Sequence, residues 1–269
     1  MSALPLGEEK IIIGMVHLRP LIGSPAYEGD WSGVCQRALE DAKALEAGGV
    51  DALLIQNRWD QAFVKDRSPP EVVAAVTWIT QVIVRAVKLP VGVHLLRNDL
   101  CGSLAVAKVC SGQFIRAACV VGATYLPQGV IEAHPTKVLQ YRNRIGAEEI
   151  QILADIHSMH YLPLLPTPVE AVAQQAVALG LADAVVIASP DTQEAMTMIR
   201  ATKGVDPALP VLVGGYARKE NIRILLEKAD GAIVGRTFER DERGGPVVVE
   251  KVQEFMAIVH SVRGKEQAG

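Results

Sequence analysis

The sequence predicts a single closed (β/α)8 barrel, and three features carry this prediction. Eight short apolar runs recur along the 269 residues, and stretches with helical period separate them. Alternating strands and helices favour a parallel sheet covered by helices, and eight such units fit a closed barrel. The segment after the first run, residues 14–25 (GMVHLRPLIGSP), lacks the glycine spacing of a doubly wound nucleotide-binding sheet.

The eight predicted strands are short and rich in Ile, Val, Leu and Ala, as strands buried on both faces require. They lie at residues 11–16, 51–56, 91–96, 113–120, 150–156, 183–188, 210–215 and 230–235. Residues 33–49 and 167–181 show the helical period most clearly. No linker-like stretch divides the chain, so residues 1–269 are predicted to form one TIM-barrel domain.

Several helix starts can be read from the capping residues. Asp30 or Ser32 can cap the first helix, and Thr167 with Glu170 has capping-box spacing. The Pro69-Pro70 pair suits the first turn of the helix that follows the second strand.

Composition and charge exclude several classes of partner. The net charge is −3, with 27 basic and 30 acidic residues mixed along the chain. The sequence therefore lacks a basic stripe, and nucleic-acid binding is not expected. The apolar run near the N-terminus is too short for a signal peptide or a membrane span. These features predict a cytoplasmic protein without membrane insertion. They do not decide whether the chain forms a homo-oligomer.

Polar side chains gather where the predicted strands end, which is where barrel enzymes carry their active sites. The motif ADIHSMH (residues 154–160) ends the fifth strand, and strand alternation places Asp155 and His157 on one face. A histidine beside a carboxylate suits proton transfer. The predicted catalytic set is Asp155, His157, Asp99, Asn98, Asn57 and His17.

Four further polar residues of the predicted strands and loops are weighed against a structural role. Arg116 in the fourth strand can pair with Asp155 as a buried structural salt bridge, or it can contact substrate. His94 lies within a strand and is interpreted as a hydrogen-bonded core residue. Gln151 is interpreted as structural, and His160 as a solvated loop residue.

An anion site is predicted between the loops after the seventh and eighth strands. Gly214 and Gly215 end the seventh strand, and residues 217–221 are predicted to begin a helix whose free N–H groups face the anion. Gly235 and Arg236 follow the eighth strand, and arginine offers a forked charge to a phosphate. Arg97 and Arg116 complete the predicted substrate-binding set.

Metal chemistry is the weaker interpretation of the same rim. His17, Asp155 and His157 can gather on one side of the barrel mouth, as a metal-dependent hydrolase would require. No second acidic ligand of clear geometry accompanies them, so no metal ligand is assigned and the cofactor is left unspecified. Four cysteines without CxxC spacing are interpreted as reduced thiols.

Several motifs resemble the BtpA family of TIM-barrel proteins. They are GMVHLRPLIGSPAY at 14–27, ALEDAKALEAGGVDALLIQN at 38–57, VGVHLLRND at 91–99, FIRA at 114–117, ADIHSMH at 154–160 and DGAIVGRTF at 230–238. The resemblance implies a barrel of the ribulose-phosphate-binding type, and hence a phosphate site. The chain departs from the family pattern at Met159, at residues 188–193 (ASPDTQ) and at Gly214-Gly215-Tyr216.

These observations predict an enzyme that acts on a small anionic substrate by acid–base chemistry. The substrate is expected to be a phosphorylated sugar, a ribosyl compound or a nucleotide-like molecule. The enzyme is expected to be a lyase, an isomerase or an enzyme that cleaves a glycosyl bond. A non-catalytic binding or assembly factor, as in photosystem biogenesis, is the alternative that the departures from the family pattern motivate. The metal-dependent hydrolase is the third hypothesis.

Overall fold

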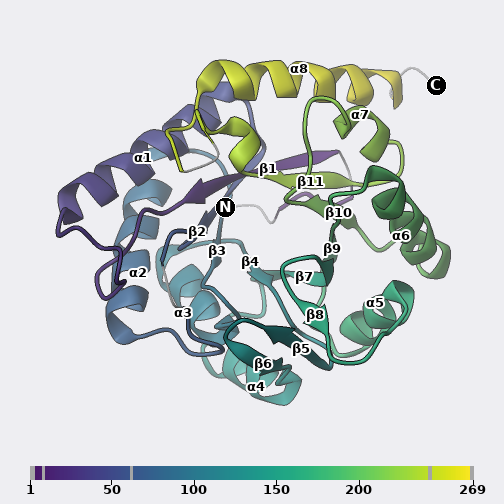
Figure 1. Cartoon of the computed structure of the whole chain (residues 1–269), viewed down its shortest axis with the longest axis horizontal. Coiled ribbons are helices and arrows are strands. Elements are labelled where there is room, and N and C mark those ends of the chain that lie inside the picture. Colours follow the sequence, from purple (N-terminus) through teal and green to yellow (C-terminus); the bar gives the residue numbers. More distant parts are fainter. Residues whose placement is uncertain (1–3, 8–9, 61–62, 242–243, 267–269) are drawn as a thin grey trace.

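The computed structural model describes residues 4–7, 10–60, 63–241 and 244–266 of the chain, and it confirms the barrel. Eight parallel strands close in the order β1-β11-β10-β9-β7-β4-β3-β2. Viewed down the barrel, the strands form the central ring and the helices lie outside it (Figure 1). The strands are β1 (Ile11–His17), β2 (Ala52–Gln56), β3 (Val91–His94), β4 (Phe114–Ala117), β7 (Gln151–Ser158), β9 (Ala184–Ala188), β10 (Val211–Gly214) and β11 (Gly231–Val234).

The helices that cover the barrel differ in length and in how they begin. They are α1 (Trp31–Gly48), α2 (Pro70–Ala86), α3 (Leu100–Cys110), α4 (Pro135–Arg144), α5 (Val169–Ala178), α6 (Thr192–Val205), α7 (Ile222–Leu225) and α8 (Val249–Glu266). Asp30 caps α1, since its carboxylate accepts from the Gly33 N–H at 2.8 Å. The capping box predicted from Thr167 is wrong, because α5 begins after Pro168 without a side-chain cap.

Two layers of apolar side chains hold the barrel together. Ile13, Leu54, Leu153 and Ile233 belong to the inner cluster, and the outer cluster packs the strands against the helices. Leu4 joins the inner cluster, and its N–H donates to the Gln151 Oε1 at 2.8 Å. Gln151 is therefore a structural residue, as the sequence indicated.

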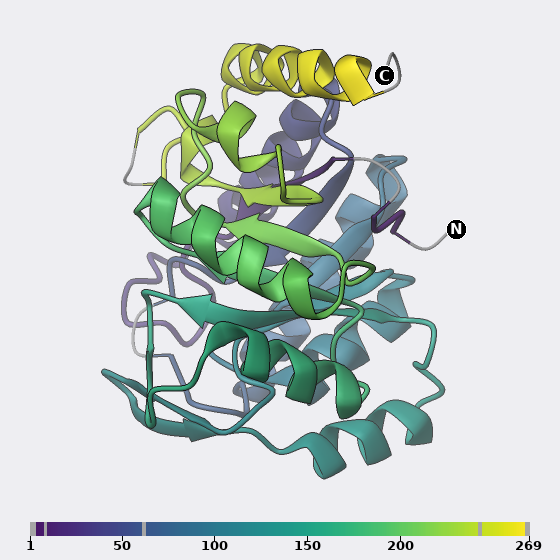
Figure 2. The ribbon, with the colours of Figure 1, turned by 90° about the vertical axis from the view of Figure 1, so that its right-hand side faces the viewer.

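A small antiparallel sheet beside the barrel was not predicted. The expected fourth strand, 113–120, is confirmed only from Phe114 to Ala117, and the chain then forms β5 (Ala123–Leu126) and β6 (Gly129–Glu132). Strand β8 (Leu162–Pro163), in the loop after β7, adds to β5. In the side view of Figure 2, the hairpin formed by β5 and β6 lies at the lower left, on the side toward which the arrows of the barrel strands point. This sheet therefore lies beside the carboxyl ends of the strands.

The helix predicted to begin within residues 217–221 starts later and is short. Helix α7 spans only Ile222–Leu225, and the Asn221 Oδ1 accepts from the Arg218 N–H at 2.8 Å. A four-residue helix has little macrodipole to offer an anion. No helix within the described part of the chain is both long and apolar enough to span a membrane.

Candidate functional site

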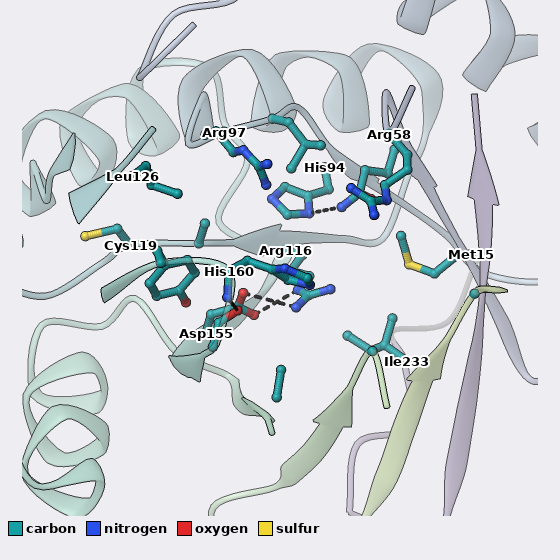
Figure 3. A pocket seen from close by; sticks show the side chains of 18 of the residues that line it. Met15, Arg58, His94, Arg97, Arg116, Cys119, Leu126, Asp155, His160 and Ile233 are labelled. Carbon is teal, nitrogen blue, oxygen red and sulfur yellow. Dashed lines mark hydrogen bonds and ion pairs between the residues drawn. The ribbon is translucent and has the colours of Figure 1, made fainter. Parts of the chain in front are cut away.

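A polar pocket opens at the carboxyl ends of the barrel strands (Figure 3). Residues from β1, β2, β3, β4, β7 and the loops after β10 and β11 line it, so the pocket occupies the mouth of the barrel. Its lining includes His17, Arg97, Arg116, Asp155, Gly215, Gly235 and Arg236 of the predicted set. Seven of the twelve predicted site residues therefore meet in one place.

An ion pair between two neighbouring strands forms one side of the pocket. The Arg116 Nε donates to the Asp155 Oδ1 at 2.8 Å, and its Nη2 donates to the Oδ2 at 3.1 Å. Both side chains are buried, with exposed fractions of 9% and 6%. Burial raises the pKa of the Asp155 carboxyl, while the Arg116 charge opposes that rise. The bidentate contact uses both oxygens of Asp155.

Three other arginines point charges toward the pocket without a carboxylate partner. Arg58, Arg97 and Arg236 form no ion pair within the described residues. The Arg97 guanidinium carbon lies 4.7 Å from the centroid of the Phe63 ring, which holds it by a cation–π contact. Burial lowers the pKa of Arg58 and of Arg97, and the charge of the neighbouring arginine adds to each shift. The pocket therefore concentrates positive charge that nothing in the described chain neutralises directly.

His160 responds to this concentration of charge. Partial burial and the nearby arginines, Arg58 and Arg116 foremost, lower the pKa of His160 to about 4. Its ring stacks on Tyr216, with 6.3 Å between the ring centroids. His160 was interpreted as a solvated loop residue; the structure places it in a turn and exposed, and it also lines the pocket.

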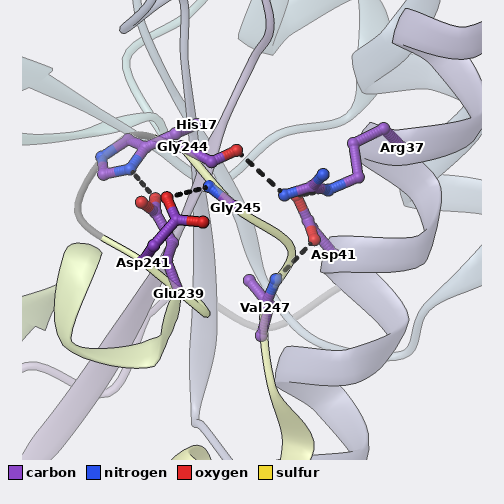
Figure 4. Close-up of polar contacts among 8 residues, drawn as sticks. All are labelled: His17, Arg37, Asp41, Glu239, Asp241, Gly244, Gly245 and Val247. Carbon is purple, nitrogen blue, oxygen red and sulfur yellow. Dashed lines mark hydrogen bonds and ion pairs between the residues drawn. The ribbon is translucent and has the colours of Figure 1, made fainter.

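His17 forms a second carboxylate contact on the opposite side of the barrel mouth (Figure 4). Its Nδ1 lies 2.5 Å from the Oε1 of Glu239, and Glu239 is only 4% exposed. A Cβ at Gly235 would stand 2.4 Å from the His17 Cε1, so only glycine leaves room for the imidazole there. The sequence identified His17 and Gly235, but it gave no sign of Glu239.

His94 lies deeper in the same pocket. Its Nδ1 lies 2.8 Å from the Gln56 Nε2, which donates to it, and the ring is 3% exposed. Burial lowers the pKa of His94 well below its ordinary range, and the charges of Arg116 and Arg97 lower it further. The prediction of a hydrogen-bonded core histidine is confirmed, although the ring also lines the pocket.

Three of the predicted catalytic residues fasten the loops around the pocket. Asn57 accepts from the Leu96 N–H at 2.9 Å, and Asn98 bonds both the N–H and the carbonyl of Cys119 at 2.9 Å. Asp99 caps α3 by accepting from the Gly102 N–H, and it also accepts from the Ser68 N–H. These contacts use polar atoms of three residues that the sequence placed in the catalytic set.

His157 does not share the inner face of β7 with Asp155. The pairing of β7 with β9 shifts register between Asp155 and His157, a bulge that breaks the strict alternation. His157 lines a neighbouring, largely apolar pocket together with Ile156 and Leu165. The placement predicted from alternation is therefore wrong for His157, although Ile152, Ala154 and Ile156 share the outer core face as expected.

The remaining predicted residues divide between the barrel wall and the pocket. Gly214 lies in the wall, where a Cβ would stand 2.8 Å from Val186, while Gly215 reaches the pocket. In the described part of the chain, His17, Asp155 and His157 do not gather as metal ligands, and no group of three or more His, Cys, Asp or Glu does. Arg58 was missed although it is the second residue after β2, where the same rule about strand ends identifies it.

The fold and this pocket define an eight-stranded α/β barrel with a cationic pocket at the carboxyl ends of its strands. Residues 8–261 match the model of the BtpA family. The Photosystem I biogenesis protein BtpA of Synechocystis is 34% identical over 256 residues, which cover 91% of this chain and 88% of that protein. The chain therefore belongs to the BtpA family.

Other relatives and solved structures extend this comparison. An uncharacterized protein of Pyrococcus furiosus is 34% identical over 259 residues, 95% of this chain and 97% of that protein. The structure of N-(5'-phosphoribosyl)anthranilate isomerase from Pyrococcus furiosus superposes with a TM-score of 0.57 at 15% identity, over 94% of this chain and all of that one. Orotidine 5'-phosphate decarboxylase from Pyrococcus horikoshii gives a TM-score of 0.56 at 13% identity, over 94% of this chain and 100% of that chain. Such distant structures support the barrel fold alone.

Proposed function

We propose that this protein is an enzyme that binds a small phosphorylated substrate, of the sugar, ribosyl or nucleotide-like class, and acts on it by acid–base chemistry. The observation that carries the proposal is the set of three arginines, Arg58, Arg97 and Arg236, that reach one pocket without ion-pair partners among the described residues. Guanidinium groups suit phosphate oxygens because they donate in a planar fork.

The position of the pocket supports catalysis in addition to binding. Barrel enzymes carry their chemistry at the carboxyl ends of the strands, and here two carboxylates and several imidazoles lie beside the cationic groups. Asp155 and His17 line the pocket and are the acid–base candidates there, while Asn57, Asn98 and Asp99 hold its loops. His157 stays a weaker candidate because it lines the neighbouring pocket.

A thermal-stability screen tests the binding half of this proposal. Inorganic phosphate, ribose 5-phosphate and unphosphorylated ribose are compared at equal concentration by the shift in Tm. A ligand present at about 100-fold above its Kd raises the free energy of unfolding by about 2.7 kcal/mol. Equal Tm shifts with ribose and with ribose 5-phosphate would refute the proposed phosphate site.

Single arginine variants locate the binding. Arg236→Gln and Arg97→Gln each remove a charged donor, and a charge-assisted hydrogen bond contributes about 1.5–3 kcal/mol, so phosphate affinity falls about tenfold or more. Arg200→Gln is the matched control, because Arg200 lies exposed on α6 and outside the pocket. A loss of affinity that is equal in the control would place binding elsewhere on the surface.

A non-catalytic binding factor is the second candidate function. The relative named as a Photosystem I biogenesis protein favours it, since that name describes biogenesis and no reaction. Incubating each stabilising ligand with the protein in D2O, and following it by NMR, separates the two candidates. Product formation or deuterium uptake supports an enzyme, whereas ligands recovered unchanged favour the binding factor.

A further inference from the structure

The His17–Glu239 contact has the form of an oriented acid–base pair. The Nδ1 of His17 lies 2.5 Å from the carboxylate oxygen, and both side chains are largely buried, with side-chain exposures of 9% and 4%. The second carboxylate oxygen of Glu239 has no hydrogen-bond partner among the described residues. Because Glu239 accepts only from His17 through its side chain, its charge favours a proton on Nδ1.

The other ring nitrogen of His17 is left available on the pocket side. A side chain at Gly235 would come within 3.0 Å of the His17 Nε2, and Gly235 itself lines the pocket beside Arg236. No hydrogen-bond partner of the Nε2 occurs within the described ranges. With the proton held on Nδ1, the Nε2 carries the lone pair that a general base needs.

The two alternatives in ADIHSMH are less suited to proton transfer. Both oxygens of Asp155 accept from Arg116, so its carboxylate is committed to a buried ion pair. The Nδ1 of His157 lies 3.3 Å from the Ala188 carbonyl, and its ring lines the neighbouring apolar pocket. Neither residue combines a free basic atom with a place among the unpaired arginines.

We infer that His17 is the residue that moves the substrate proton and that Glu239 is its positioning residue. This inference rests on the proposed function and deepens it: the substrate carries an anionic group at Arg58 and Arg236 and an acidic proton within reach of the His17 Nε2. The proton passes to the Nε2 and the electron pair stays on the substrate. The imidazolium then lies against Glu239, and the same ring returns the proton to the product.

Nitrogen NMR of histidine-labelled protein tests the pair without a known substrate. Spectra are recorded at about pH 9, well above the ordinary pKa of histidine, with the His17 signals assigned from a His17→Asn variant. We expect the Nδ1–H tautomer in the wild type and its loss in Glu239→Gln. Glu149→Gln is the matched control, because it removes a carboxylate from an exposed pair with Lys108.

Inorganic phosphate then reports whether His17 faces the ligand. We expect phosphate to shift the His17 Nε2 signal of the wild type, a response that a purely structural pair would not give. Glu239→Gln should bind phosphate at least as tightly, because it removes a negative charge near the arginines.

A wild-type Nε2–H tautomer, or an Nε2 signal that stays fixed while phosphate binds, overturns the inference. Both readouts come from the wild type, so a Glu239→Gln variant that fails to fold leaves the test intact. Absence of phosphate binding with the Nδ1–H tautomer present would refute the proposed function, and with it the catalytic use of the pair, but not the orientation of His17 by Glu239.

Discussion

Replacing Asp155 with Asn isolates the charge of the buried pair with Arg116. The substitution preserves the shape of the side chain but puts an amide nitrogen opposite one guanidinium donor. One of the two contacts, at 2.8 and 3.1 Å, is then lost and the buried Arg116 cation keeps no counter-charge. Removing one member of a buried ion pair typically costs about 3–5 kcal/mol.

That free-energy change is large enough to measure in two ways. In a domain of this size each kcal/mol shifts Tm by about 2–4 °C, so Asp155→Asn should lower it by about 6–20 °C. Urea unfolding gives the free energy directly. The double variant Arg116→Met with Asp155→Leu should recover much of the loss, because it removes both buried charges together.

The outcome separates a structural pair from a catalytic one. If Asp155 transfers a proton, its amide variant loses about a hundred-fold or more in turnover while its stability changes little. If it serves Arg116, the variant is destabilised and the activity of each folded molecule persists. A change in unfolding free energy below about 1 kcal/mol, well short of the range for buried pairs, would refute the structural account.

Three further predictions follow from single contacts. Gly235→Ala should displace the His17 ring and cost about 1–3 kcal/mol by overpacking, measured by urea unfolding; full stability would show that the ring moves freely. The pKa of about 4 for His160 lies below its ordinary value, so the stability that His160 contributes is present above about pH 6.5 and is lost as the pH falls toward 4. His160→Asn should flatten this pH dependence of the unfolding free energy, and an unchanged pH profile in the variant would contradict the prediction. Asn98→Ala leaves the Cys119 backbone groups unpaired and should cost about 2–3 kcal/mol in the same unfolding assay, whereas a neutral effect would mean that water replaces the amide.

The barrel could be predicted because its evidence is periodic and local. Each of the eight apolar runs became a barrel strand, and the Asp30 cap is a contact over three residues. The hairpin of β5 and β6 was missed although its pairing is local, with Leu126 opposite Gly129. The addition of β8 to this hairpin joins segments far apart in sequence, Tyr125 with Leu162 among them. No short-range pattern encodes such a pairing.

The candidate site was predictable only as far as strand direction determines it. The rule that residues near the carboxyl ends of the strands meet at the barrel mouth correctly placed Arg97, Arg116 and Asp155 in one pocket. Alternation failed at His157, because a bulge is set by packing against β9 and leaves no mark in the order of residues. Glu239 lies beyond a short 3-10 helix after β11, and its contact with His17 spans 222 residues of sequence.

The charge balance of the pocket constrains its ligand. Among the described lining and contact residues, four arginines (Arg58, Arg97, Arg116 and Arg236) face two carboxylates, Asp155 and Glu239, which leaves two formal positive charges with the histidines neutral. The whole chain carries −3, so this excess is local to the pocket. A phosphate monoester carries about −1.5 to −2 charges near neutral pH and can balance it, whereas a single carboxylate leaves one charge uncompensated. Phosphorylated ligands should therefore bind more tightly than carboxylates of the same carbon skeleton, and the difference should shrink in Arg236→Gln.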